Sequence, residues 1–322
     1  MFKPRHALMA AVAAVIATAT SSAIAQEKFP SRTIEVITHA GAGGGTDIMA
    51  QMMMKEARGI LGVDMALANK RGGGGAVAHA YVAQRPADGY TLLTFTGTQI
   101  ATIIRGKSAF KSLDDLIPIA RGTSDPQFIM VSSKSAWKTP KEFMAAHKTK
   151  SIKYGIASVG GGDHITTWQF TRKLGVKDPS VIPLVGGGEI TIALVGGNVD
   201  AGILNYQEAE AQIKAGEVKP LIVLSETRQP AAPDVPTAKE LGIDYSISTV
   251  RGWMVRKGTP PEAVKVLREA LLKAMKQPGY QEYLKNVGAS PDSVGGHEDW
   301  GKQVNAEAKQ TAEALTALGL MK

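Results

Sequence analysis

The chain has no cysteine among its 322 residues, and this absence removes several classes of chemistry at once. Disulfide bonds, thiolate metal sites, a cysteine nucleophile and a lipid-anchoring cysteine are all excluded. Aromatic residues make up only 6% of the chain, and no dense run of lysine and arginine is interleaved with them. The net charge of +8 is scattered along the sequence instead. Nucleic acid is therefore not expected as a partner.

Long apolar runs are also missing, apart from one near the N-terminus. There, a basic segment (MFKPRH) precedes an apolar stretch (ALMAAVAAVIATAT) and a small-residue site, AIA, at 23–25. This order is typical of a secretory signal peptide, which we predict over residues 1–25 with cleavage near Ala25. A transmembrane anchor is disfavoured because the apolar stretch is short and no stop-transfer pattern follows. The mature chain would begin at Gln26 and lie in a periplasm.

Catalytic and metal-binding motifs are scarce as well. The chain has no G-x-S-x-G elbow, and its S-x-x-K matches at 108–111 and 135–138 lack the companion motifs of that enzyme class. The histidines after the signal segment never show H-x-x-x-H spacing, which disfavours a metal site. They are His39, His79, His147, His164 and His297. The sequence therefore predicts no enzyme, no metal and no cofactor.

What the chain does have is a regular alternation of strand-like and helix-like segments. Aliphatic and β-branched runs predict strands, and segments with apolar residues every three or four positions predict helices. The predicted strands cover 33–40, 88–96, 151–157, 181–185, 199–205 and 219–225, and the predicted helices cover 47–62, 164–175, 190–197, 260–277, 279–288 and 297–319. Such alternation favours an α/β fold whose parallel or mixed sheets are covered on both faces.

Glycine is abundant, with 35 copies that gather partly in four runs. The runs lie at 41–45, 72–75, 160–162 and 186–188. Two of them, at 43–45 and 160–162, connect a predicted strand to a predicted helix, where free N–H groups and the helix dipole favour an anion. The other interpretation is that both are tight turns with Asp47 and Asp163 as helix caps. Two similar loops in one chain favour a binding site between them.

The common phosphate motifs do not fit these loops. A P-loop requires Gly-Lys-Ser/Thr at its end, and GGGTD has no lysine. A dinucleotide fingerprint is matched only loosely, because Thr46 stands where its third glycine belongs and Asp64 follows a turn, not a second strand. An exported enzyme that uses the glycine loops to bind a nucleotide or phosphate therefore stays the second interpretation. A purely structural exported protein is the third.

Several segments together resemble the tripartite tricarboxylate transporter substrate-binding proteins, also called Bug proteins. GGGTD resembles the first ligand loop of that family, and YGIASVGGGDH resembles its second. Further family stretches are resembled by ANKRGGGGAVAHAYVAQRPADGYTLL, LVGGNVDAGILN and IKAGEVKPLIVLSETRQPAAPDVPTAKELG. The last of these is the most specific because it contains PDVPT. The resemblance covers essentially the whole chain after the signal segment.

This resemblance implies a two-lobe periplasmic-binding-protein fold, or Venus flytrap, in which each lobe is a mixed α/β sheet flanked by helices. The chain would cross between the lobes at 123–128 and at 248–253. The first lobe would comprise 26–124 plus 250–322, and the second would comprise 125–249. The implied function is a monomeric receptor that captures a small di-, tri- or aromatic carboxylate between the lobes. It would deliver this ligand to the membrane permease subunits of a tripartite tricarboxylate transporter, or report it to a sensor kinase.

The resemblance also implies which residues bind the ligand, largely through main-chain N–H groups that hold one carboxylate. The first loop contributes Gly43, Gly44, Gly45, Thr46 and Asp47, the second contributes Ser158, Val159, Gly160, Gly161, Gly162, Asp163 and His164, and Thr94, Thr96, Thr98 and Asn205 face the cleft. His39 is placed at the cleft mouth because HAGA stands where the family has a proline-rich segment.

The chain departs from the family pattern close to this site. Ile203-Leu204 replaces a Phe-Asp pair that the family carries before its asparagine. The loss of this acid predicts a cleft that disfavours amines. It favours an apolar or aromatic carboxylate, or a dicarboxylate whose far end is reached by Arg71 or Arg105.

Overall fold

The computed structural model describes residues 28–176 and 179–321. The predicted signal peptide, residues 1–25, lies outside the described residues. Within the described ranges, no helix combines the length and the apolar character that crossing a membrane requires.

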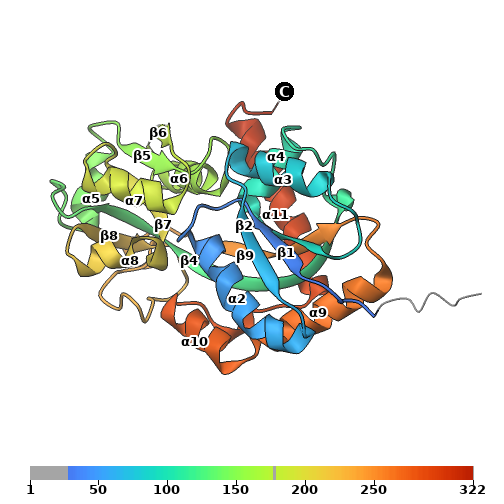
Figure 1. The fold of residues 1–322 in the computed structure, drawn as a ribbon. Coiled ribbons are helices and arrows are strands. Elements are labelled where there is room, and N and C mark those ends of the chain that lie inside the picture. Colours follow the sequence, from blue (N-terminus) through green and yellow to red (C-terminus); the bar gives the residue numbers. More distant parts are fainter. Residues whose placement is uncertain (1–27, 177–178, 322) are drawn as a thin grey trace, which may run out of the picture.

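A nine-stranded mixed sheet runs through the molecule, with helices packed around it (Figure 1). The strand order is β2-β1-β3-β9-β4-β7-β5-β6, and β8 pairs with β4 beside this path. The strands are β1 (Ile34–Thr38), β2 (Met65–Asn69), β3 (Thr91–Thr96), β4 (Leu116–Ser132), β5 (Lys153–Ile156), β6 (Ser180–Pro183), β7 (Ala201–Asn205), β8 (Val218–Val223) and β9 (Ser248–Arg256).

Strand β4 belongs to both halves of this sheet, and Figure 1 shows it running from one half into the other. From Leu116 to Pro126 it pairs antiparallel with β9, and from Gln127 to Ser132 it pairs with β7 and β8. We call β1, β2, β3 and β9 the first half and β5, β6, β7 and β8 the second half. Within each half, the pairs β1–β2, β1–β3, β5–β6 and β5–β7 are parallel.

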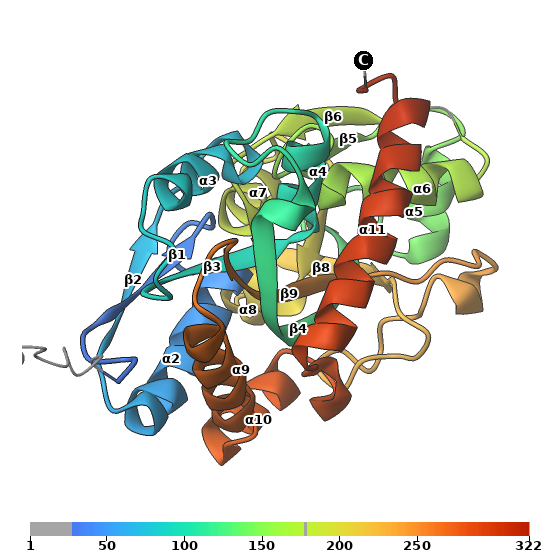
Figure 2. The same cartoon turned by 90° about the vertical axis from the view of Figure 1, so that its right-hand side faces the viewer.

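The helices connect the parallel strands or close the chain. They are α2 (Gly45–Leu61), α3 (Ala76–Ala83), α4 (Gly97–Ile104), α5 (Pro140–Ala146), α6 (Gly162–Lys173), α7 (Gly187–Val195), α8 (Tyr206–Lys214), α9 (Pro261–Met275), α10 (Pro278–Asn286) and α11 (His297–Ala317), with a short 3-10 turn, η1 (Gly73–Gly75), before α3. Helix α11, the long red helix of Figure 2, packs on α4 and β4 and also contacts α6.

Every strand and helix expected from the sequence is present, with shifted ends, and the fold is α/β in both halves. Strands β2, β4 and β9 and helices α3, α4, α5 and α8 are additional. Helix α7 begins at Gly187, not at 190, because the glycine run forms its N-terminus with Gly186 as the N-cap. The methionines of α2 are core residues: Met49 and Met53 are fully buried against α9 and the sheet.

Candidate ligand-binding cleft

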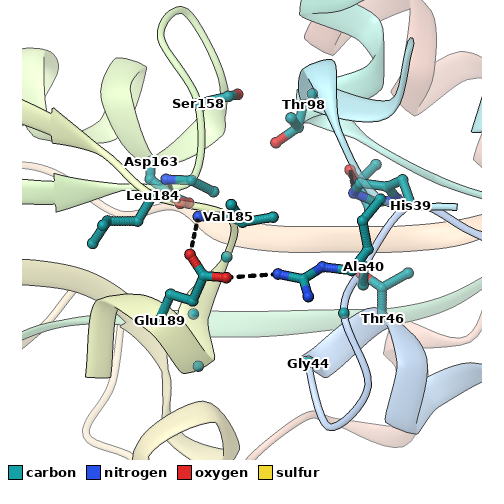
Figure 3. Close-up of a pocket in the computed structure, with 18 of the residues that line it drawn as sticks. His39, Ala40, Gly44, Thr46, Thr98, Ser158, Asp163, Leu184, Val185 and Glu189 are labelled. Atoms are coloured by element: carbon teal, nitrogen blue, oxygen red, sulfur yellow. Dashed lines mark hydrogen bonds and ion pairs between the residues drawn. The ribbon is translucent and has the colours of Figure 1, made fainter. Parts of the chain in front are cut away.

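A pocket opens between the two halves, where the strands on both sides end (Figure 3). Its volume is about 810 Å³, within the range of small-molecule sites. Its lining comes from the segments that follow β1, β2 and β3 in the first half and β5, β6 and β7 in the second. The carboxyl ends of parallel strands form the usual ligand-binding edge of an α/β sheet.

The predicted binding residues divide into those that line this pocket and those that lie outside its lining. The lining includes His39, Gly44, Gly45, Thr46, Thr96, Thr98, Ser158, Val159, Asp163 and Asn205. Outside the lining lie Gly43, Asp47, Thr94, Gly160, Gly161, Gly162 and His164. Both glycine loops therefore reach the pocket, but not through every residue that the resemblance implied.

The first loop, between β1 and α2, is braced by Asp47. Gly43 has a left-handed φ of 77°, which glycine adopts without strain. The N–H of Gly43 donates to Asp47 Oδ2 at 3.0 Å, and Asn69 Nδ2 donates to Asp47 Oδ1 at 2.7 Å. Asp47 is only 1% exposed. The Asp47 carboxylate stabilises the loop conformation and does not line the pocket. The N-cap of α2 is Gly44, which has no side chain to accept a capping hydrogen bond.

The second loop, between β5 and α6, repeats this geometry in the other half. Gly160 has a φ of 78°, and its N–H donates to His164 Nδ1 at 2.9 Å. Gly161 is the N-cap of α6. His164 thus stands in the same relation to Gly160 as Asp47 does to Gly43. The two loops are structural equivalents that approach the pocket from opposite sides.

A third loop of the same kind, between β6 and α7, was not among the predicted anion loops. The N–H of Val185 donates to Glu189 Oε2 at 3.0 Å, and Gly186 is the N-cap of α7. Figure 3 shows Glu189 between Val185 and the opposite wall, where its Oε1 accepts from Nη2 of Arg71 at 2.6 Å. The available signal was the sequence GGGE, a glycine run followed by an acid.

The remaining glycine run, at 72–75, directly follows Arg71, which lines the pocket. Gly72, Gly73, Gly74 and Gly75 all have positive φ, and Thr102 Oγ1 donates to the carbonyl oxygen of Gly74 at 2.8 Å. A second arginine, Arg105, also lines the pocket. It donates a hydrogen bond to the carbonyl oxygen of Val159 in the second half. Both arginines whose roles the sequence left open therefore join the first half to the second.

A buried arginine that sequence reasoning missed lies at the inner end of the pocket. Arg251, on β9, lines the pocket although it is only 2% exposed. It forms a salt bridge with Asp125 of β4, and it donates to Asn205 Oδ1 at 2.8 Å and to Thr46 Oγ1 at 3.2 Å. Burial lowers the pKa of Arg251 to about 10, which leaves it protonated at neutral pH. One side chain thus contacts residues of both halves.

Two partly buried carboxyl groups also line the pocket. Glu208 Oε2 accepts from the N–H of Asn205 at 3.0 Å, and Asp163 Oδ2 accepts from the N–H of Ala157 at 3.1 Å. Burial raises the pKa of Glu208 to about 7, and the nearby Asp163 acts in the same direction. Burial likewise raises the pKa of Asp163 to about 6. Sequence reasoning included Asp163 but not Glu208.

His39 is a neutral side chain in this pocket. Burial, followed by the charges of His79 and Arg251, lowers the pKa of His39 to about 3. Its Nε2 lies 3.5 Å from Thr96 Oγ1, and its enclosed Nδ1 has no hydrogen-bond partner among the residues that the structure describes. His39 therefore adds hydrogen-bonding capacity but no positive charge.

Comparison with known proteins identifies the family of this chain. Residues 49–320 match the tripartite tricarboxylate transporter family receptor. Protein BugT of Bordetella pertussis is 28% identical over 291 residues, which cover 88% of this chain and 89% of BugT.

Solved structures give the same result. The periplasmic binding protein BugD aligns with a TM-score of 0.83 and 27% identity, covering 91% of this chain and all of the BugD chain (100%). MatC from Rhodopseudomonas palustris, solved with bound malate, aligns with a TM-score of 0.79 and 27% identity, covering 89% of this chain and 100% of MatC. These similarities confirm the predicted periplasmic-binding-protein fold. The chain belongs to the tripartite tricarboxylate transporter receptor family of solute-binding proteins.

Proposed function

We propose that this chain is a periplasmic receptor that binds a small organic carboxylate between its two lobes and delivers it to a tripartite tricarboxylate transporter. The observation that carries this proposal is the pair of equivalent glycine loops, which begin α2 and α6 on opposite sides of one pocket. The N–H groups of a helix's first turn lack intrahelical acceptors and favour an anion. The malate held by the related MatC supports a carboxylate as that anion.

We further propose the lobe boundaries implied by the sequence, 26–124 plus 250–322 and 125–249. The pairing of β4 supports them, because its partner changes from β9 to β7 between Pro126 and Gln127. Two crossing strands permit a hinge motion that closes the lobes on a ligand. The proposal includes cleavage near Ala25, export to the periplasm and action as a monomer with a permease or a sensor kinase.

The charges in the pocket favour a carboxylate over a phosphate or nucleotide. Arg251 is paired with Asp125, and Arg71 is paired with Glu189. Asp163 and Glu208 also line the pocket, and both would oppose a group with two or more negative charges. The same argument disfavours the exported nucleotide enzyme, so the proposed receptor has no catalytic role.

The proposal is tested by thermal unfolding of the chain from Gln26 onward with matched panels of carboxylates and nucleotides. A ligand at 100 times its Kd stabilises the folded state by about 2.7 kcal/mol, so a carboxylate should raise the Tm by several degrees. Small-angle scattering with that ligand should show a smaller radius of gyration as the lobes close. Stabilisation by nucleotides alone would refute the receptor and favour the enzyme.

A further inference from the structure

Glu208 occupies the part of the pocket where helices from both halves begin. Its Oε2 accepts from the N–H of Asn205, the N-cap of α8. The backbone of Gly45, the first residue of α2, lies near enough to lower the pKa of this carboxyl group. The start of α7 lies against it, since a Cβ added to Gly187 would be 2.6 Å from both Glu208 oxygens. Glu208 therefore lines the same pocket as Gly45 and Thr46 of the first glycine loop, which we propose to hold the ligand carboxylate.

The charge of this carboxyl group is not balanced by a cation. The buried Arg251 is paired with Asp125, and Arg71 is paired with Glu189. Neither Glu208 nor Asp163 takes part in an ion pair within residues 28–176 and 179–321. A carboxylate offers about four acceptor positions, and the N–H of Asn205 occupies one of them.

We infer that Glu208 contacts the ligand and selects carboxylates that carry a hydrogen-bond donor, a hydroxyl or an ammonium group, on the carbon next to the carboxylate. The inference rests on the proposed function, because it assumes that the ligand carboxylate binds at the first loop. A carboxylate held by the N–H groups that begin α2 places its neighbouring carbon beside Glu208. A donor there meets the acceptor positions that the backbone leaves open.

This inference goes against the expectation drawn from Ile203-Leu204. The acid missing before Asn205 is replaced by one that follows it, a single helical turn later, in the same pocket. The raised pKa of Glu208, about 7 through burial, agrees with this role. A donor on the ligand would restore part of the solvation that the ionised carboxylate has lost.

The opposing explanation is that Glu208 serves only to cap α8. It forms a capping box with Asn205, a common way to begin a helix. The chain offers a matched control, since Glu142 forms the same kind of capping box with Thr139 at the start of α5. Glu142 is exposed and does not line the pocket. A capping role alone would give the two glutamates the same mutational effects.

The deciding experiment is calorimetry on the chain from Gln26 with three matched sets of acids. Each set has hydrogen, hydroxyl or ammonium at carbon 2: succinate, malate and aspartate; butyrate, 2-hydroxybutyrate and 2-aminobutyrate; 3-phenylpropionate, 3-phenyllactate and phenylalanine. In the set that binds, the hydroxy or amino acid should bind at least about tenfold more tightly than the unsubstituted acid, because a site built for a donor rejects analogues without it. The tighter of the two identifies the donor.

Variants separate selection from capping. Glu208→Gln should reduce an ammonium preference at least tenfold and a hydroxyl preference severalfold, since glutamine keeps the shape but loses the charge. Glu142→Gln should keep the wild-type ratio. Equal wild-type affinity for substituted and unsubstituted acids, or a ratio that Glu208→Gln leaves unchanged, would overturn the inference but leave the carboxylate receptor standing. Binding of no carboxylate at all would overturn both.

Discussion

At the scale of single residues, polar side chains that follow the glycine loops hydrogen-bond to the loop backbone. Three N–H groups, those of Gly43, Gly160 and Val185, each donate to the side chain four residues later. Two of those acceptors, Asp47 and His164, were predicted to bind the ligand. The sequence located these loops correctly, but it could not show whether a polar side chain points into the pocket or toward the loop backbone. That side follows from the local backbone path and from partners distant in sequence, such as Asn69 for Asp47.

The first prediction concerns the main chain of the first loop. Gly44→Val should weaken carboxylate binding at least about 100-fold, because a branched side chain blocks the N–H groups that begin α2. The cost in the free energy of unfolding should be about 1 kcal/mol, since Gly44 has an ordinary φ of −71° and valine is a poor N-cap. Titration calorimetry and urea unfolding measure the two effects.

Gly296→Val is the matched control for this variant. Gly296 is also a helix N-cap with an ordinary φ, −68°, and it lies outside the pocket lining with open space around it. It should show the cost in stability without the loss of affinity. Wild-type affinity in Gly44→Val would remove the first loop from the binding site.

The second prediction concerns the buried pair at the inner end of the pocket. Arg251→Met leaves Asp125 buried without its cation, which typically costs about 3–5 kcal/mol of the free energy of unfolding. The Oδ1 atom of Asp125 already has no hydrogen-bond partner in the described part of the chain. The double variant Arg251→Met/Asp125→Asn should recover part of that loss, as urea unfolding would show. Equal destabilisation in the single and double variants would mean that the pair contributes packing but no net charge compensation.

At the scale of elements, the longer helices were the easiest to anticipate, and the four that were missed, α3, α4, α5 and α8, are all short. Helices α2, α9 and α11 have enough turns to show a clear apolar periodicity. Helix α4 has only eight residues, rich in isoleucine and threonine, whose β-branched side chains lower helix propensity. It forms because Thr96 and Gln99 make a capping box at its start and because α11 packs against it. Such tertiary support leaves no periodic signal in the sequence.

The third prediction arises where α11 meets α4. Glu307 of α11 lies against Gly97, the first residue of α4, and its enclosed Oε2 has no hydrogen-bond partner in the described ranges. Burial raises the pKa of Glu307 to about 7 from an ordinary value of 4.5. Between these pH values the folded state binds a proton that the unfolded state does not. Stability should therefore fall as pH rises from about 4.5 to 7.

Glu307→Gln removes this contribution, so its stability relative to wild type should improve with pH across the same window and level off above pH 7. The gain should be on the order of 1–3 kcal/mol, measured by urea unfolding at a series of pH values. Asp163 and Glu208 act in the same direction, so a smaller slope should persist in the variant. Glu313→Gln, at an exposed position of the same helix, is the control. Parallel curves for Glu307→Gln and wild type would contradict the prediction.

At the scale of the whole molecule, the site depends on strand order that the sequence does not reveal. Arg251 and Asp125 meet only because β9 inserts between β3 and β4. Glu208 and Gly45 line one pocket only because the second half faces the first. Local patterns predicted the α/β class and the first two loops, and the family resemblance supplied the two-lobe arrangement. The contacts between the halves join residues that are distant in sequence, 54 positions apart for Arg105 and Val159 and 118 for Arg71 and Glu189, and a single sequence carries no local signal for them.

The last prediction concerns the pair that spans the mouth of the cleft. Arg71 and Glu189 join the two halves at 2.6 Å, but their side chains are 45% and 41% exposed, so the pair is worth at most about 1 kcal/mol. If it only holds the halves together, Arg71→Glu and Glu189→Arg should each raise the Kd of the carboxylate by up to about fivefold at low salt. The effect should shrink as salt screens the charges. The exchanged variant Arg71→Glu/Glu189→Arg should restore both the affinity and the compact state seen by small-angle scattering.

If Arg71 instead reaches the far end of a dicarboxylate, Arg71→Glu should weaken the binding of succinate far more than that of butyrate, and the exchange should not restore the affinity for succinate. Rescue by the exchange therefore assigns Arg71 to lobe closure, and failure of rescue assigns it to the ligand.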